Sequence, residues 1–281
     1  MPINRAGSSN SAIQQCVSLS DVSDPRLHAI VPHHRPEPLS VSRQIFESMG
    51  IASRVLKKTG YETFPDGPGN QDAATVMSGG RNWTRMKMAR DMIQGGHCAT
   101  EADELNVVKE WGGGSCGEHR RLVAAEFRQM HRDLPVIQVK DSTQDHNYVI
   151  VGDWRDRTVG EHAVVVDPWP MLKKVFTYGE RVETSTPIPL ITIPPGPPDT
   201  DRALSAAMAT KPADNAKMNR FTKMRVKLPA GPKAAEALVA GLRQNGSSWD
   251  QASVTANIHQ EYVSPDGRVA AFNEVPLEYL G

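Results

Sequence analysis

The stretch Gly-Gly-Gly-Ser-Cys-Gly-Glu-His at 112–119 constrains the fold most, because it predicts a helix that begins at a cysteine. Ser115 is a favourable N-cap residue, and Glu118 follows three residues later, as a capping box requires. The pattern predicts a helix from about residue 116 to 130, with Cys116 at its first position. Unpaired backbone N–H groups and the positive end of the helix dipole meet there, and both favour an anion such as a thiolate.

Two later segments, 146–154 and 162–167, are rich in β-branched and aromatic residues, which favour strands. A polar, glycine-containing connection joins them, so we expect an antiparallel hairpin. If the turn is centred between residues 156 and 157, His146 lies directly opposite Asp167, with Cβ atoms about 4.5–5.5 Å apart. This register would bring an imidazole and a carboxylate together on one face of the sheet.

These three residues together form the thiol version of a catalytic triad. We predict Cys116 as the nucleophile, His146 as the base that takes or shares its proton, and Asp167 as the carboxylate that orients the imidazole. The backbone N–H of Cys116, at the start of the helix, is placed to bind a developing oxyanion.

The same stretch resembles the transglutaminase-like core, which belongs to the broader papain-like group. The motifs are the cysteine at a helix start, a short strand at 134–139, His-x-x-x-x-Val from His146, and Val-x-Val-Asp-Pro around Asp167. The resemblance covers residues 111–170. It implies an α+β fold with a papain-like or transglutaminase-like core, in which helices pack on an antiparallel sheet.

The order and spacing of the triad are similar to those of bacterial type III secreted virulence effectors with this core. The resemblance therefore implies a cysteine-dependent acyl-transfer enzyme that acts on a protein amide, as a deamidase, transglutaminase or protease. It implies secretion from a bacterium, a host protein as substrate in the host cytoplasm, and no metal or other cofactor. Tyr148 matches the aromatic residue that many members carry two positions after the histidine.

Papain-type enzymes place a glutamine a few residues before the cysteine, where its side chain completes the oxyanion hole. Glu110 and Trp111 occupy that neighbourhood here. The sequence therefore leaves the second oxyanion donor open.

Composition limits the partners that we expect. The 32 basic and 32 acidic residues balance, so bulk charge predicts no nucleic-acid partner. No apolar stretch approaches about 18 residues, so we predict no integral membrane segment. Three unevenly spaced cysteines indicate no disulfide framework, and the oligomeric state stays open.

The chain divides into four predicted regions. Residues 1–40 are rich in Ser, Pro and Asn and are predicted to be a disordered N-terminal leader, which the resemblance would make a secretion leader. Residues 41–183 form the predicted catalytic core. A proline-rich linker at 184–200 then leads to a C-terminal α+β extension at 201–281.

Local patterns predict helices at 82–94, 100–110 and 231–244. The sequence Pro-Asp-Gly at 265–267 predicts a hairpin turn.

Three alternatives remain open at this point. Cys98 also follows two glycines and adjoins a histidine, so it is the rival nucleophile. A protein-binding module with a relic triad is the non-catalytic alternative. A zinc site could draw on five residues, which are Cys116, His119, His131, His146 and His162.

Overall fold

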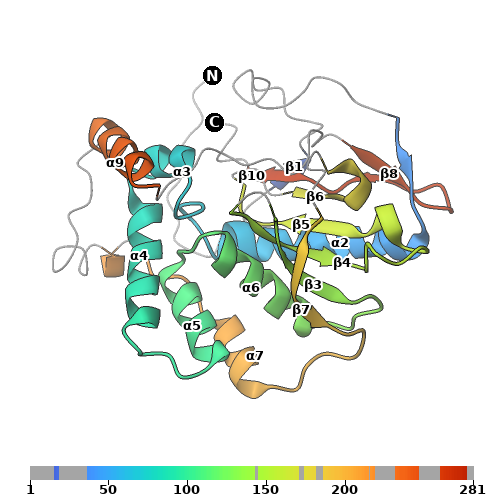
Figure 1. Cartoon of the computed structure of the whole chain (residues 1–281), viewed down its shortest axis with the longest axis horizontal. Helices are drawn as coiled ribbons and strands as arrows, with labels where there is room; N and C mark the ends of the chain where they lie inside the picture. The colour runs from blue at the N-terminus through green and yellow to red at the C-terminus, as the bar shows by residue number, and fades with distance from the viewer. Residues whose placement is uncertain are drawn as a thin grey trace, which may run out of the picture.

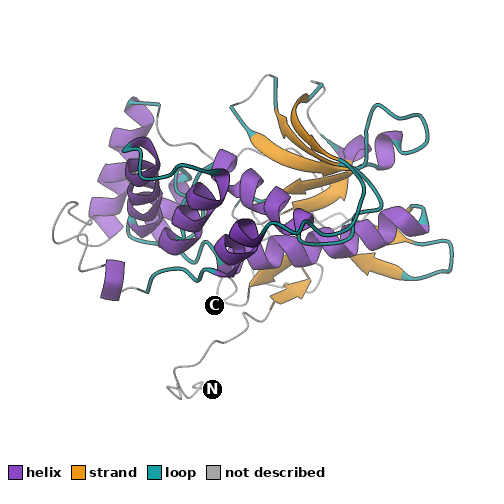
Figure 2. Ribbon diagram, turned by 90° about the horizontal axis from the view of Figure 1, so that it is seen from below, coloured by secondary structure: helices purple, strands orange, loops and turns teal. Residues whose placement is uncertain are grey.

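The computed structural model describes residues 16–18, 37–142, 145–170, 174–181, 186–214, 216–218, 232–246 and 260–276. Within them, helices combine with an antiparallel five-stranded sheet, which confirms the predicted α+β class (Figure 1). Figure 2 shows the helices gathered on one side and the strands on the other, with one long helix running beneath the sheet.

The helices follow the local signals of the sequence. The predicted helices at 82–94, 100–110 and 231–244 are present as α4, α5 and α9. The longer helices of the described residues are α2 (Arg43–Leu56), the π-helix η2 (Lys57–Glu62), α3 (Asp72–Met77), α4 (Arg81–Gln94), α5 (Glu101–Trp111), α6 (Cys116–Arg128), α7 (Arg202–Ala209) and α9 (Pro232–Gln244). Two short 3-10 helices are η3 (Gly160–His162) and η4 (Tyr178–Glu180).

The main sheet has the strand order β6-β5-β4-β3-β7, and every neighbouring pair is antiparallel. Helix α6 packs on β3 and β4, while α2 packs on β5 and β6. The strands are β3 (Val136–Lys140), β4 (Asn147–Val151), β5 (Val164–Asp167), β6 (Lys174–Thr177) and β7 (Ile188–Ile193).

Both faces of this sheet are apolar. On one face, Val149 packs in a single core with Met49 of α2 and Val123 of α6. On the other, Phe176 packs with Trp154. Successive strand residues point to opposite faces, so a strand that is buried on both sides is apolar along its whole length. The valine-rich strands β4 and β5 meet this requirement.

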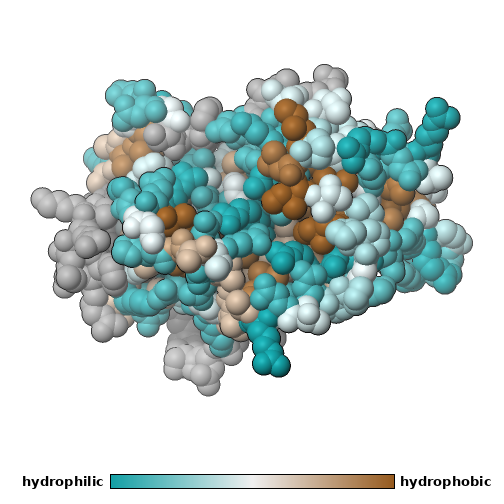
Figure 3. Space-filling model, turned by 60° about the horizontal axis from the view of Figure 1, so that its bottom comes forward, coloured by the Kyte–Doolittle hydropathy of each residue, from teal (hydrophilic) through white to brown (hydrophobic). Residues whose placement is uncertain are grey.

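The segment at 184–200 was predicted to be a linker, but its middle part is strand β7, which pairs with β3 at the edge of the sheet. Gln138 of β3 lies opposite Ile191, with an irregularity in register beside this pair. Prolines are tolerated here because an edge strand needs hydrogen bonds on one side only. Ile188, Leu190 and Ile191 are all exposed large hydrophobic residues. Figure 3 shows hydrophobic side chains gathered in a patch on one face of the molecule.

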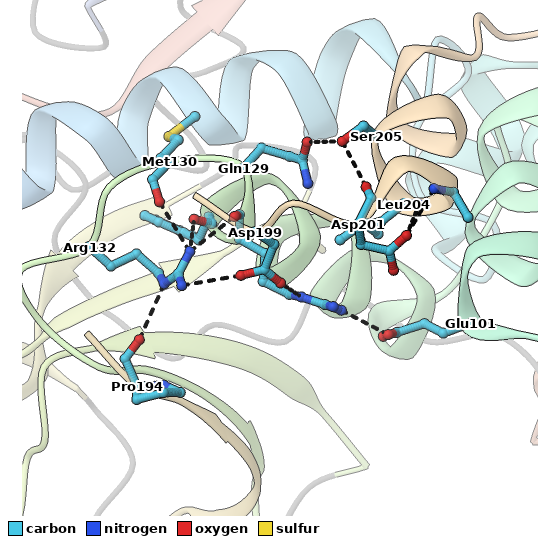
Figure 4. A network of polar contacts seen from close by, with 12 residues as sticks. Glu101, Gln129, Met130, Arg132, Pro194, Asp199, Asp201, Leu204 and Ser205 are labelled. Carbon is cyan, nitrogen blue, oxygen red and sulfur yellow. Dashed lines mark hydrogen bonds and ion pairs between the residues drawn. The ribbon is translucent and has the colours of Figure 1, made fainter. Parts of the chain in front are cut away.

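A polar network fastens the chain beyond β7 to the end of α6 (Figure 4). The guanidinium of Arg132 donates to the carbonyl of Pro194 at 3.3 Å and pairs with Asp199 at 3.3 Å. Asp199 also pairs with Arg128 at 2.7 Å, and Arg128 in turn pairs with Glu101 at the start of α5. The segment that follows β7 is therefore bound to Arg128 and Arg132 at the end of α6.

The predicted C-terminal extension at 201–281 packs on the predicted core through two aromatic residues. Tyr262 and Phe272 belong to the same hydrophobic core as α2, and the rings of Phe46 and Phe272 lie 5.1 Å apart. The hairpin that carries them consists of β8 (Glu261–Val263) and β9 (Val269–Ala271). Its turn is at the predicted position. Aromatic rings gain stability from burial, and α2 supplies the surface that buries them.

The predicted leader at 1–40 lies mostly outside the described residues. Two short strands of it are described. Strand β1 (Cys16–Ser18) pairs with β10 (Glu274–Pro276), and β2 (Leu39–Ser40) runs parallel to β8. Within the described part of the chain, no helix has the length and apolar character to cross a membrane.

Candidate active site

The loop before Cys116 requires its glycines. Gly112 ends α5 with φ +59°, a left-handed conformation that favours glycine. At Gly113, a Cβ atom would lie 2.3 Å from the backbone carbonyl carbon of Arg85, and at Gly114 one would lie 2.6 Å from the Cβ of Glu118. The loop is therefore pressed directly against α4 and the first turn of α6.

Helix α6 begins at Cys116, and the predicted capping box is present. The carboxylate of Glu118 accepts a hydrogen bond from the backbone N–H of Ser115 at 2.7 Å and another from its hydroxyl at 2.8 Å. Arg90 donates to both residues. Burial opposes ionisation of Glu118, but Arg90 and Ser115 together hold the pKa of its carboxyl below the usual value. An ionised cap thus fixes the start of the helix.

The predicted register of β4 and β5 is wrong by two residues. Val149 lies opposite Val166, and the same register places Asp167 opposite Tyr148 rather than His146. A shift of two residues preserves the face of the sheet, whereas a shift of one would reverse it. His146 and Asp167 therefore remain diagonal neighbours on one face, within reach of each other.

The structure brings His146 and Asp167 into contact. The imidazole Nε2 lies 3.0 Å from a carboxylate oxygen of Asp167, and both side chains are buried. The other carboxylate oxygen accepts the backbone N–H of Trp169 at 3.2 Å. The rings of Trp169 and Tyr148 lie 5.3 and 5.5 Å from the imidazole. The aromatic rings and the carboxylate together fix the orientation of the imidazole.

This environment favours the protonated imidazole. Burial opposes the charge, but the carboxylate of Asp167 and the side chain of Cys116 outweigh it and raise the pKa of His146 from 6.5 to about 10. Because Nε2 binds Asp167, Nδ1 is the ring nitrogen available to Cys116. Within the described residues Nδ1 makes no hydrogen bond of ordinary geometry, which is common in a catalytic pair without substrate.

The sulfur of Cys116 has two further neighbours. Its Sγ lies 3.8 Å from the backbone carbonyl of Asp145 and accepts a hydrogen bond from Nδ2 of Asn147 at 3.4 Å. The carbonyl oxygen of that amide accepts from Arg120 at 2.9 Å. Sequence reasoning did not predict Asn147 or Arg120 as residues of the site. Arg120 lies four residues after Cys116, on the same helix face, but no pattern marks Asn147.

A second loop supports the site from the side of Trp169. The indole N–H of Trp169 donates to Asn70 at 2.8 Å, and the amide of Gln71 donates to the Trp169 carbonyl at 3.0 Å. The backbone N–H of Gly69 donates to the carbonyl of Gly114 at 2.8 Å. The loop at 69–71 thus joins the cysteine loop to the end of β5.

Cys98, the rival nucleophile, lies in a different environment. It follows α4 and packs against the cluster of Met88, Val107 and Trp111. Burial, followed by the carboxylate of Glu104, raises the pKa of the Cys98 thiol. This opposes formation of the thiolate at Cys98, which also lacks the helix start and the Asn147 contact that Cys116 has.

The five residues of the alternative zinc site do not form one cluster, because His119 and His131 have other partners. The imidazole of His119 stacks on Phe64 with ring centroids 3.6 Å apart, and the exposed His131 pairs with Asp133. Across the described ranges, no group of three or more His, Cys, Asp or Glu residues is arranged to hold a metal ion.

Comparison with known proteins adds no relative: no family model matches the chain, and no curated protein or solved structure matches it significantly.

Proposed function

We propose that this protein is a cysteine-dependent acyl-transfer enzyme that acts on a protein amide through Cys116, His146 and Asp167. The observation that carries the proposal is the convergence of these side chains. A buried, carboxylate-bound imidazole with a raised pKa lies beside a cysteine at the start of a helix. Structural cysteines do not require such a partner.

We further propose that the fold is a papain-like or transglutaminase-like core. Two features support this. The helix that begins with Cys116 packs on an antiparallel sheet, and His146 and Asp167 lie at the same end of two neighbouring strands of that sheet. The proposed role of a bacterial effector that modifies a host protein rests on the resemblance of the motifs.

The reaction proceeds in two steps. The thiolate of Cys116 attacks the amide carbonyl carbon, and the imidazolium Nδ1–H of His146 donates a proton to the leaving amine or ammonia as the C–N bond breaks. A thioester on Cys116 results. The neutral imidazole then takes a proton from water or from a lysine amine, which attacks the thioester; the C–S bond breaks and releases the thiolate, so the thiolate–imidazolium pair is restored. Asp167 stays ionised throughout and orients the ring.

The test compares the wild-type protein with Cys116→Ala and Cys98→Ala after each is incubated with a host-cell extract. Mass spectrometry of the extract distinguishes deamidated glutamine, amine cross-links and new termini. We expect one of these changes with the wild type and with Cys98→Ala but not with Cys116→Ala. If all three proteins leave the extract unchanged while they retain a bound partner, the protein is a binding module and the proposed function is wrong.

A further inference from the structure

We propose that the side-chain amide of Asn147 is the second oxyanion donor of this site and that Arg120 is the positioning residue that aims it. The proposal rests on the acyl-transfer function above. It assigns a donor at a position that the resemblance does not provide, since Asn147 follows the histidine rather than preceding the cysteine.

The orientation of the amide is determined by its two partners. Nδ2 of Asn147 donates to the sulfur of Cys116 at 3.4 Å, and Oδ1 accepts from Nη1 of Arg120 at 2.9 Å. A guanidinium has donors only, so it must bind the oxygen of the amide. The NH₂ group is thereby turned toward Cys116.

The donor is also in the right place for the chemistry. In the tetrahedral intermediate, the oxyanion is on the carbon that is bonded to Sγ. A donor in contact with Sγ therefore lies within reach of the developing charge, as does the backbone N–H of Cys116. The two N–H groups, one from the main chain and one from a side chain, would stabilise the same oxygen.

Rigid elements hold both residues. Asn147 is the first residue of β4, where it pairs with Lys140 of β3. Arg120 lies one turn after Cys116 on α6, which packs on β4. Neither residue depends on a flexible loop, so the donor is preorganised, which is what makes an oxyanion donor effective.

Other candidates for this role are engaged elsewhere. The amide nitrogen of Gln71 donates to the carbonyl of Trp169 at 3.0 Å. The indole N–H of Trp111, near the position where papain-type enzymes carry their glutamine, points to the sulfur of Met92 at 3.2 Å. Glu110 pairs with Lys217 and has no N–H donor in its side chain.

The experiment separates oxyanion stabilisation from thiol reactivity. Acylation of Cys116 by p-nitrophenyl acetate passes through a tetrahedral oxyanion, whereas its alkylation by iodoacetamide does not. Both rates are measured by intact mass in a Cys16→Ala, Cys98→Ala background, in which Cys116 is the one remaining thiol of the sequence. We expect Asn147→Ala and the similarly sized, uncharged Asn147→Leu to slow acylation by about 10²–10³-fold while alkylation changes only a few-fold. Arg120→Ala should slow acylation less, and Arg120→Lys should recover part of the loss.

Unchanged acylation in Asn147→Ala would overturn the proposal, and so would an equal loss of acylation and alkylation, since that would mean a purely structural role. Failure of the proposed function looks different. In that case Cys116 is alkylated in the wild type but acquires no acetyl group from the ester, so the wild type and the Asn147 variants show the same absence of acylation.

Discussion

The imidazole Nε2 of His146 lies 3.0 Å from the carboxylate of Asp167, although β4 and β5 do not pair these two residues directly. They meet as diagonal neighbours across the sheet, at the end where α6 begins. This contact decides which ring nitrogen faces the cysteine, because the carboxylate binds Nε2 and leaves Nδ1 for Cys116.

The first prediction concerns the base and its carboxylate. His146→Ala removes the group that transfers the proton, whereas Asp167→Asn leaves it in place but misorients it. We therefore expect His146→Ala to lower kcat by about 10⁴–10⁶-fold and Asp167→Asn to lower it less, as measured by the acylation and deacylation of Cys116. A larger effect of Asp167→Asn would show that the carboxylate does more than orient the ring.

The second prediction concerns two of the three thiols, Cys98 and Cys116. Burial and Glu104 raise the pKa of Cys98, while Cys116 lies at a helix start beside His146. Iodoacetamide at neutral pH should therefore label Cys116 faster than Cys98, as peptide mass spectrometry would show. His146→Ala should slow the labelling of Cys116 and leave that of Cys98 unchanged. Faster labelling of Cys98 would reverse the assignment of the nucleophile.

The third prediction concerns stability and pH. The pKa of His146 is raised from 6.5 to about 10, so the folded state holds this proton more tightly than the unfolded state. The stabilisation is fully present below about pH 6.5 and is lost as the pH rises toward about 10. Urea unfolding should show a steeper loss of unfolding free energy over this range for the wild type than for His146→Gln. Equal slopes would contradict the charged imidazole.

The fourth prediction uses two glycines that flank the cysteine. A Cβ at Gly113 would lie 2.3 Å from backbone atoms of α4, so Gly113→Ala should cost about 1–3 kcal/mol of unfolding free energy and displace the cysteine loop. At Gly117 a Cβ meets no atom within 4 Å. Gly117→Ala should therefore stabilise α6 by about 0.5–1 kcal/mol. Denaturant unfolding of both variants checks the contrast, and similar effects would mean that the loop is not tightly packed.

The fifth prediction concerns Arg132. Its guanidinium is buried and donates to four backbone carbonyls besides pairing with Asp199. Arg132→Ala leaves those acceptors unsatisfied and should lower the unfolding free energy by about 1–3 kcal/mol. It should also expose the segment after β7 to limited proteolysis. Arg155→Ala, which removes an exposed pair with Asp153, should change neither measurement appreciably.

Local signals predicted much of the site. The Ser115–Glu118 capping box, the start of α6 at Cys116 and the β-branched runs of β4 and β5 depend on residues that are near each other in the chain. The same holds for α5, which begins with the capping box of Thr100 and Asp103. The triad could therefore be proposed because two strands joined by a short connection limit where their residues can meet.

Only the tertiary structure decided the rest. The register that makes His146 and Asp167 diagonal neighbours depends on packing against α2 and α6, and the proline-rich stretch becomes β7 because β3 offers it an open edge. Asn147 contacts both the sulfur of Cys116 and the guanidinium of Arg120 because α6 packs on β4. Capping and strand formation follow from interactions within a few residues. Register, edge pairing and the environment of Cys116 follow from burial shared by distant segments, which no local pattern encodes.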